Sequence, residues 1–285
     1  MNGRIKVKFV RLVAMVLAPL LPGASAGAVM TDQEDSRRYI MYRNKWMQKL
    51  ARLLYHRKVF AVMPVGSRQV TTVRLRLPVS PDRRELYRSL LPPELEMPAV
   101  PRIYFYVSEF QGTYPVRIEG GYWEAAVCLK AGCKLDSKTE LEKGGWFPLE
   151  MPVSAKSALN SGLMMGYPKY MADISLVAGD SSYESSVNVE GREFFRMHYD
   201  QTEVEVTALE EEEMTVPFYL VPDGRINIMQ NEVVEQKSFT CRPGIVSLSV
   251  NSKARWTGLL DSLETKGPGV LKIITGRFNL TRRSR

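Results

Sequence analysis

Short apolar segments that end at proline or glycine constrain the fold of this sequence more than any other feature. The 17 prolines and 20 glycines are spread along 285 residues, which favours many short strands and turns over long helices. In residues 70–79 the apolar Val73 and Leu75 alternate with polar residues. Arg74 and Arg76 fall on the opposite side, and this two-residue period predicts a strand.

Similar extended segments recur to the end of the chain. We expect strands over residues 103–110, 122–129, 146–153, 172–178, 203–209, 217–221, 227–234, 245–250 and 270–280. Ser80-Pro81-Asp82 begins a short helix that ends at Pro92-Pro93, and a second small helix covers residues 155–162. Many strands with few helices predict a mainly β (α+β) fold that is either closed or two-layered.

The net charge excludes one class of partner. The formal charge is +8, and removing the four basic residues among the first 26 leaves +4, which is too mild to indicate nucleic-acid binding. Zinc-finger spacing and RNA-binding aromatic motifs are absent from the sequence. We therefore expect no nucleic-acid partner.

Residues 1–26 have the pattern of a secretory signal peptide. A basic start precedes an apolar run, and Ala24-Ser25-Ala26 supplies small residues for cleavage after Ala26. The run is too short to cross a bilayer as a helix. We expect a periplasmic or secreted protein, while an uncleaved anchor or a buried N-terminal helix is the alternative.

Residues 27–60 predict an amphipathic helical extension ahead of a domain over residues 61–285. Thr31-Asp32-Gln33-Glu34 matches a capping box, and aromatic and leucine side chains then recur at helical spacing. A basic face lies beside this stripe. Such a helix either packs on its own domain or contacts a partner or a membrane surface peripherally.

The three cysteines are Cys128, Cys133 and Cys241. Residues 129–132 resemble a hairpin tip, so Cys128 and Cys133 could form a disulfide in an exported protein. The alternative is that all three are small buried side chains. The spacing lacks further ligands, and the only two histidines lie far apart in the sequence, so we expect no metal site.

Lys169 is the most informative residue for function. It lies in an apolar run, Gly166-Tyr167-Pro168-Lys169-Tyr170-Met171, with two more methionines just before it. Burial disfavours a charged amine, which would lower the lysine pKa and make the amine a nucleophile toward ketones. The alternative is that the stem of Lys169 packs in the core while its ammonium reaches water.

Five segments in order resemble the acetoacetate decarboxylase family over roughly residues 65–280. They are residues 75–97, with Leu90-Leu91-Pro92-Pro93-Glu94-Leu95; Tyr122-Trp123-Glu124-Ala125-Ala126-Val127; Gly145-Trp146-Phe147-Pro148-Leu149-Glu150-Met151; Gly166-Tyr167-Pro168-Lys169; and Arg255-Trp256-Thr257-Gly258. The resemblance implies a closed, cone-like β-barrel with a few peripheral helices, no cofactor, and a homo-oligomer. This family is also a standard example of a lysine activated by its surroundings.

The resemblance gives two residues a chemical role. Lys169 matches the family lysine that forms a Schiff base with a β-keto acid, and Glu124 matches a glutamate of the same pocket. Tyr122, Tyr167 and Tyr170 are candidates to bind a substrate oxygen. Arg74 and Arg76 are candidate cations near the lysine, and Met165 belongs to a methionine-rich segment that either lines a substrate pocket or is plain core.

Two departures from the family pattern qualify this expectation. Tyr170 stands where the family has a second lysine, and Ser161-Gly162-Leu163 stands where it has Gly-Arg-Glu. The sequence therefore predicts an exported enzyme that forms an imine between Lys169 and a small keto acid, followed by decarboxylation or by aldolase or dehydratase chemistry. The alternative is a non-catalytic small-molecule-binding or envelope-associated protein with the same barrel.

Overall fold

The computed structural model describes residues 67–113, 121–133, 144–201, 217–221 and 226–284, and these are mostly strand. The strands are β1 (Gln69–Pro78), β2 (Leu95–Glu96), β3 (Arg102–Gln111), β4 (Tyr122–Cys133), β5 (Gly145–Val153), β6 (Lys169–Met171), β7 (Asp173–Ala178), β8 (Ser182–Val189), β9 (Arg192–Asp200), β10 (Phe218–Leu220), β11 (Asn227–Val250) and β12 (Glu264–Ser284). The helices in this part of the chain are α4 (Arg84–Leu90) and α5 (Lys156–Met165), with 3-10 turns η2 (Pro81–Arg83) and η3 (Arg255–Leu259). The predicted signal peptide, the helical extension and the strand over residues 203–209 lie outside the described residues.

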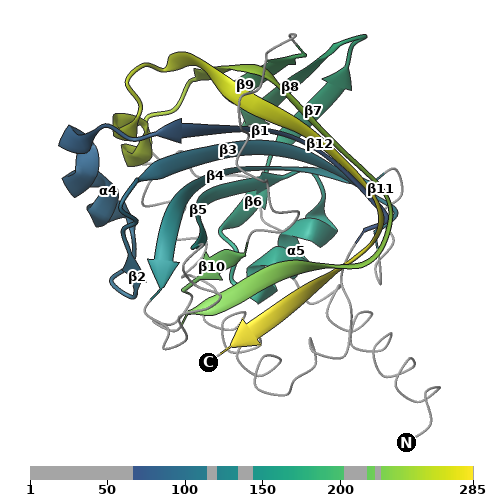
Figure 1. Ribbon diagram of the computed structural model, residues 1–285, viewed down its shortest axis with the longest axis horizontal. Helices are drawn as coiled ribbons and strands as arrows, with labels where there is room; N and C mark the ends of the chain where they lie inside the picture. Colours follow the sequence, from purple (N-terminus) through teal and green to yellow (C-terminus); the bar gives the residue numbers. More distant parts are fainter. Residues whose placement is uncertain (1–66, 114–120, 134–143, 202–216, 222–225, 285) are drawn as a thin grey trace, which may run out of the picture. The chain divides into compact units, whose positions relative to one another are not determined.

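One curled sheet contains most of these strands, and it closes on itself. Its order is β10-β5-β4-β3-β1-β12-β11, and β10 pairs with both β5 and β11. Strands β9, β8 and β7 extend the sheet from the far end of β11 (Figure 1). The closed β-barrel with few helices, which the sequence predicted, is therefore confirmed.

Alternating side chains give the central strands two buried faces. Val73 of β1 lies opposite Val107 of β3 on one face, and Arg74 lies opposite Tyr106 on the other. The first face joins a large hydrophobic core that also includes Phe195 of β9. The second face joins a smaller cluster made by β3, β4, β5, α5, β10 and β11. Because its members come from opposite sides of the ring, this cluster lies inside the ring.

Two short helical elements cover one end of the large core. The Tyr87 hydroxyl of α4 lies 3.0 Å from the carbonyl oxygen of Arg102 and 2.6 Å from that of Lys130, which ties α4 to β3 and β4. Trp256 of η3 makes an edge contact with the Phe105 ring at 5.7 Å. Ser80 precedes η2 as expected, but its side chain makes no capping hydrogen bond.

The strand predictions were wrong in two places. Strands β8 and β9 were not anticipated, because β8 is rich in serine and its buried positions do not form a continuous apolar pattern. Residues 227–234 and 245–250 belong to one strand, β11, which pairs with β12 over almost its whole length. Pairing with a long partner holds the intervening polar residues extended, which local sequence patterns do not indicate.

The hairpin predicted between Cys128 and Cys133 is also wrong. Both cysteines lie on the single strand β4, where five residue steps span about 16 Å, so their backbones are too far apart for a disulfide. Cys128 is a free thiol and is completely buried, and Cys241 is free as well. The disulfide alternative is therefore excluded for Cys128.

Candidate active site

The end of α5 brings Lys169 into the ring. Gly166 has φ of 91°, the left-handed conformation that ends many helices. The backbone amides of Tyr167 and Gly166 donate to the carbonyl oxygens of Gly162 and Leu163, at 3.0 and 3.1 Å. This Schellman arrangement reverses the chain, so that Lys169 begins β6 beside Met151 of β5.

The Lys169 side chain is buried against α5. Only 7% of its surface is exposed, and its amine lies 5.3 Å from the centre of the Tyr167 ring. A Cβ atom placed on Gly162 would come within 2.6 Å of Lys169 Cε and closer still to Cδ. The lysine stem therefore lies directly over the bare backbone of Gly162. Its ammonium does not reach water as the alternative interpretation required.

Glu124 of β4 is the partner of the Lys169 amine. Lys169 Nζ donates to Glu124 Oε2 at 2.5 Å, and the Tyr106 hydroxyl donates to Oε1 at 2.7 Å. Both oxygens of the carboxylate are thus engaged, in a side chain that is only 8% exposed. The arrangement joins β3, β4 and β6 through one buried carboxylate.

The carboxylate also affects the acidity of its neighbours. Burial, and after it the nearby Glu124 charge, raises the pKa of Tyr106 and of the Cys128 thiol well above their usual values. The same two causes, followed by Tyr167, raise the pKa of Tyr122. The two phenols and the thiol therefore stay protonated at neutral pH. The hydroxyl groups of Tyr106 and Tyr122 remain hydrogen-bond donors.

A row of polar side chains runs from Glu124 across three neighbouring strands. Ser108 pairs with Glu124, Thr72 pairs with Ser108, and Lys272 of β12 pairs with Thr72. Side chains at paired positions share a face, and the Thr72 and Ser108 hydroxyl oxygens are 2.8 Å apart. Lys272 is only 4% exposed, so the row places a second buried amine on the same face as Glu124.

Two arginines lie on the next positions of this face. Arg74 is buried and pairs with Tyr106, whereas Arg76 pairs with Tyr104 and is less deeply buried. The guanidinium carbon of Arg76 lies 5.8 Å from the Tyr104 ring centre and 5.5 Å from that of Trp146. Both predicted arginines therefore face the inside of the ring together with Glu124.

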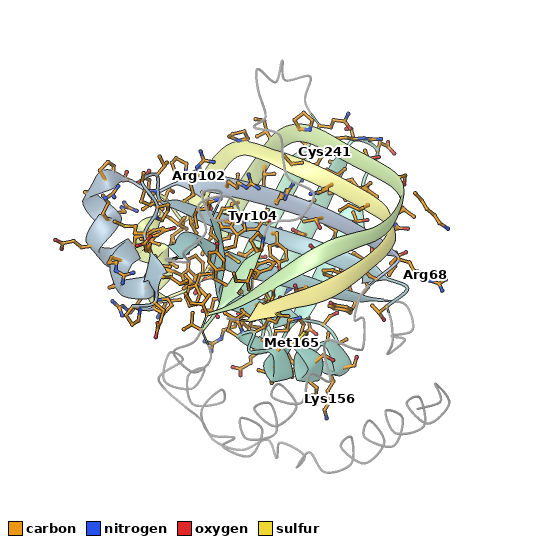
Figure 2. The ribbon with its side chains drawn as sticks, turned by 60° about the horizontal axis from the view of Figure 1, so that its bottom comes forward. Arg68, Arg102, Tyr104, Lys156, Met165 and Cys241 are labelled. Atoms are coloured by element: carbon orange, nitrogen blue, oxygen red, sulfur yellow. The ribbon has the colours of Figure 1, made fainter. Side chains whose placement is uncertain are left out.

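The structure brings most of the other predicted site residues together. Tyr122 is on the same face of β4 as Glu124 and stacks on Phe110 at 4.9 Å. Met165 is buried in the same cluster as Tyr167, and Figure 2 shows it on the side of α5 toward the sheet, whereas Lys156 points away. Of the other methionines considered, Met151 joins this cluster, whereas Met171 is 44% exposed.

Tyr170 is the exception among the predicted residues. It follows Lys169 directly on β6 and pairs with Pro152. Because successive strand residues point to opposite faces, its side chain is directed away from the one that carries the Lys169 amine. The geometry therefore does not bring Tyr170 to the Lys169–Glu124 pair.

Three residues of the site were missed by sequence reasoning. Tyr106 could have been found, because it alternates with apolar residues on β3 and so shares a face with Tyr104 and Ser108. Lys272 lies in an apolar strand, but only the pairing of β12 with β1 shows that it shares a face of the sheet with Glu124. Gly162 carries no local signal, because its role depends on where the Lys169 stem lies.

Neither a metal site nor a membrane-spanning helix is found among the residues that the structure describes. No group of three or more histidine, cysteine and acidic side chains there could hold a metal ion. No helix in the described segments is long and apolar enough to cross a membrane.

The arrangement suits carbonyl chemistry. A buried amine can attack a ketone once it is neutral, and the adjacent carboxylate is placed to accept a proton from it. Arginine and lysine side chains on the same face provide positive charge for an anionic group, which binds more strongly in a dry site than in water.

Comparison with known proteins decides the family. The family model for acetoacetate decarboxylase matches residues 63–249, which is more than half of the chain. The chain belongs to the acetoacetate decarboxylase family. The match includes α5, Glu124 and Lys169, whereas Lys272 lies beyond it. A comparison with curated proteins found no match.

Solved structures show the acetoacetate decarboxylase fold. The enduracididine biosynthesis enzyme MppR with bound HEPES buffer has a TM-score of 0.56 at 17% identity, covering 78% of this chain and 88% of that one. An acetoacetate decarboxylase structure has the same TM-score at 14% identity, covering 78% and 89%. The enzyme from Legionella pneumophila gives 0.54 at 14% identity, covering 76% and 87%.

Proposed function

We propose that this protein is an enzyme that forms an imine between Lys169 and the carbonyl carbon of a small keto acid. The observation that carries the proposal is the buried contact of 2.5 Å between Lys169 Nζ and Glu124 Oε2. Membership of the acetoacetate decarboxylase family supports it. MppR, which shares the fold, has been solved with pyruvate and with the condensation product of pyruvate and imidazole 4-carboxaldehyde.

The first step requires a neutral amine. Glu124 accepts a proton from the Lys169 ammonium, and the free amine attacks the ketone carbon. The carbinolamine that results loses water and becomes a protonated imine. Tyr106 holds the other carboxylate oxygen through its hydroxyl, so Glu124 stays oriented toward the amine during this exchange.

The protonated imine then acts as an electron sink. When the substrate is a 3-oxo acid, the bond to the carboxylate breaks, carbon dioxide leaves, and the electron pair moves into the imine to give an enamine. Protonation at carbon and hydrolysis release the ketone and the lysine. Aldol or dehydration chemistry uses the same electron sink with a different bond, and the substrate decides between them.

Positive charge on the same face supports an acidic substrate. We propose that Arg74, Arg76 and the buried Lys272 bind the carboxylate of the keto acid while its carbonyl meets Lys169. Charge-assisted hydrogen bonds of this kind are shorter and stronger than neutral ones. Met151 and Met165, both buried in the cluster beside Lys169, would contact the apolar part of the keto acid.

Product analysis tests the proposed activity. The protein is incubated with acetoacetate, acetopyruvate and longer 3-oxo acids, or with pyruvate and an aldehyde, while released carbon dioxide and condensation products are measured. We expect one of these products with the wild type and none with Lys169→Ala. Binding of a keto acid by calorimetry without any product would instead favour the non-catalytic alternative with the same barrel.

We also propose export, on the basis of the pattern in residues 1–26. Expression of the full chain in a host with a secretion system, followed by mass determination of the protein outside the cytoplasm, provides the test. A product that begins at Gly27 supports cleavage after Ala26, and an uncleaved cytoplasmic product contradicts it.

A further inference from the structure

Gly162 shares a contact with the reactive lysine that a larger residue could not have. A Cβ atom at this position would lie 2.6 Å from Lys169 Cε and 3.0 Å from Cγ, with Cδ closer still. Carbon atoms in ordinary contact are about 3.5–4.0 Å apart. A side chain at residue 162 would therefore displace the Lys169 stem from the position in which its amine contacts Glu124.

The backbone of Gly162 does not itself require glycine. Gly166 and five other glycines have positive φ angles, but Gly162 is not among these residues. It lies inside α5, where alanine is a better helix former than glycine. The glycine is thus unfavourable for the helix alone, and its benefit lies in the space that it leaves for the lysine stem.

We infer that Gly162 is a positioning residue, which holds the Lys169 amine against Glu124 by letting the lysine stem lie on the helix backbone. The inference rests on the proposed function of Lys169 and deepens it. An added methyl group pushes the flexible stem aside by roughly 1 Å or more. A shift of this size removes the amine from its 2.5 Å contact with Glu124.

The test compares Gly162→Ala with a matched glycine. Gly132→Ala, on the same strand as Glu124, adds a methyl group whose nearest neighbour is 3.5 Å away and needs no rearrangement. We expect both variants to fold, with a lower thermal midpoint for Gly162→Ala than for Gly132→Ala, because only Gly162→Ala breaks the buried contact between Lys169 and Glu124. Borohydride trapping of a keto acid should slow about 100-fold in Gly162→Ala, and not at all in Gly132→Ala.

A double-mutant cycle separates positioning from a general structural effect. Glu124→Gln is measured alone and combined with Gly162→Ala. If Gly162 acts by placing the amine on Glu124, the second substitution adds less than about twofold to the first, because the same contact is already lost. The inference would be overturned if the rate losses of the two single variants multiplied in the double variant. It would also be overturned if Gly162→Ala failed to fold or trapped the keto acid at the wild-type rate.

A second probe keeps this result distinct from the proposed function. Reductive methylation with formaldehyde and cyanoborohydride labels lysine amines without any keto acid, and peptide mapping reports Lys169 alone. We expect Glu124→Gln to change the labelling rate of Lys169 at least fivefold in the wild-type background. In the Gly162→Ala background the same substitution should change this rate less than twofold. A wild type that forms no keto acid adduct but shows this pattern contradicts only the proposed function. Equal dependence in both backgrounds contradicts the role of Gly162.

Discussion

The Lys169 amine and the Glu124 carboxylate form an ion pair of 2.5 Å inside the barrel, and less than a tenth of either side chain is exposed. Taking two charges out of water is costly, so such a pair contributes only when its geometry is good and its other hydrogen-bonding positions are satisfied. The Tyr106 hydroxyl satisfies the second carboxylate oxygen. The pair therefore affects the stability of the folded protein as well as the chemistry of the site.

Removing one partner of this pair should cost more than removing both. We expect Lys169→Met and Glu124→Gln each to lower the free energy of unfolding by about 3–5 kcal/mol, because each leaves an uncompensated buried charge. The double variant should lose less than either single variant. Urea unfolding of the four proteins measures the coupling, and additive losses would show that the two side chains are energetically independent.

The interior cations should distinguish an acidic substrate from a neutral one. We expect Arg74→Gln and Lys272→Gln each to weaken the apparent affinity for acetoacetate roughly 10-fold or more, since one charge-assisted hydrogen bond contributes about 1.5–3 kcal/mol. The neutral diketone 2,4-pentanedione also condenses with lysine but lacks the carboxylate. Its rate of adduct formation, followed by absorbance, should be unchanged, and equal losses for both ligands would refute a carboxylate-binding role.

High pH should destabilise the barrel through its buried phenols. The pKa values of Tyr106 and Tyr122 are raised in the folded protein, chiefly by burial. A group with a raised folded pKa contributes stability below its unfolded pKa and loses it as pH rises further. Because the ordinary pKa of tyrosine is 10.0, urea midpoints should fall from about pH 9 upward. Tyr106→Phe and Tyr122→Phe should each flatten this fall, and an unchanged slope would contradict the assignment.

Cys128 should resist alkylation in the native state. Burial and the nearby Glu124 charge raise the pKa of its thiol, and the thiolate is the reactive form. Cys241 is only partly buried, so it serves as the internal comparison. With iodoacetamide at pH 8, peptide mapping should find Cys241 modified at least 10-fold faster than Cys128. Comparable rates would mean that the interior of the barrel admits the reagent and deprotonates the thiol.

Local patterns in the sequence were sufficient to predict the central strands. Alternating side chains on β1 placed Val73 and Leu75 on one face and Arg74 on the other, and the structure confirms this division. Strand β8 was missed because pairing with β7 and β9, rather than an apolar pattern, holds its serine-rich sequence extended. Strand β9 did carry a readable pattern, since Phe195, Met197 and Tyr199 are buried at alternate positions. Pairing over long sequence separations is not encoded within any one segment.

Site residues that the family resemblance names could be predicted from the sequence. Site residues that reach the site only through strand pairing could not. Lys169 and Glu124 are 45 positions apart; the resemblance implied that they lie together, and the structure has the amine and the carboxylate 2.5 Å apart. Tyr106 and Lys272 reach the site through the pairing of β3 with β4 and of β12 with β1. The registers of these strand pairs depend on the whole sheet, so neither residue could be assigned from its own segment.

Borohydride trapping tests the central claim most directly. The protein is incubated with pyruvate or acetoacetate, reduced, and examined by intact mass and peptide mapping, with Gly132→Ala as a folded control and Lys169→Ala as the negative control. We predict one reduced adduct per chain, located on Lys169 and absent from Lys169→Ala. A folded wild type that gives no adduct with any keto acid, or an adduct on another lysine, would contradict imine formation at this site.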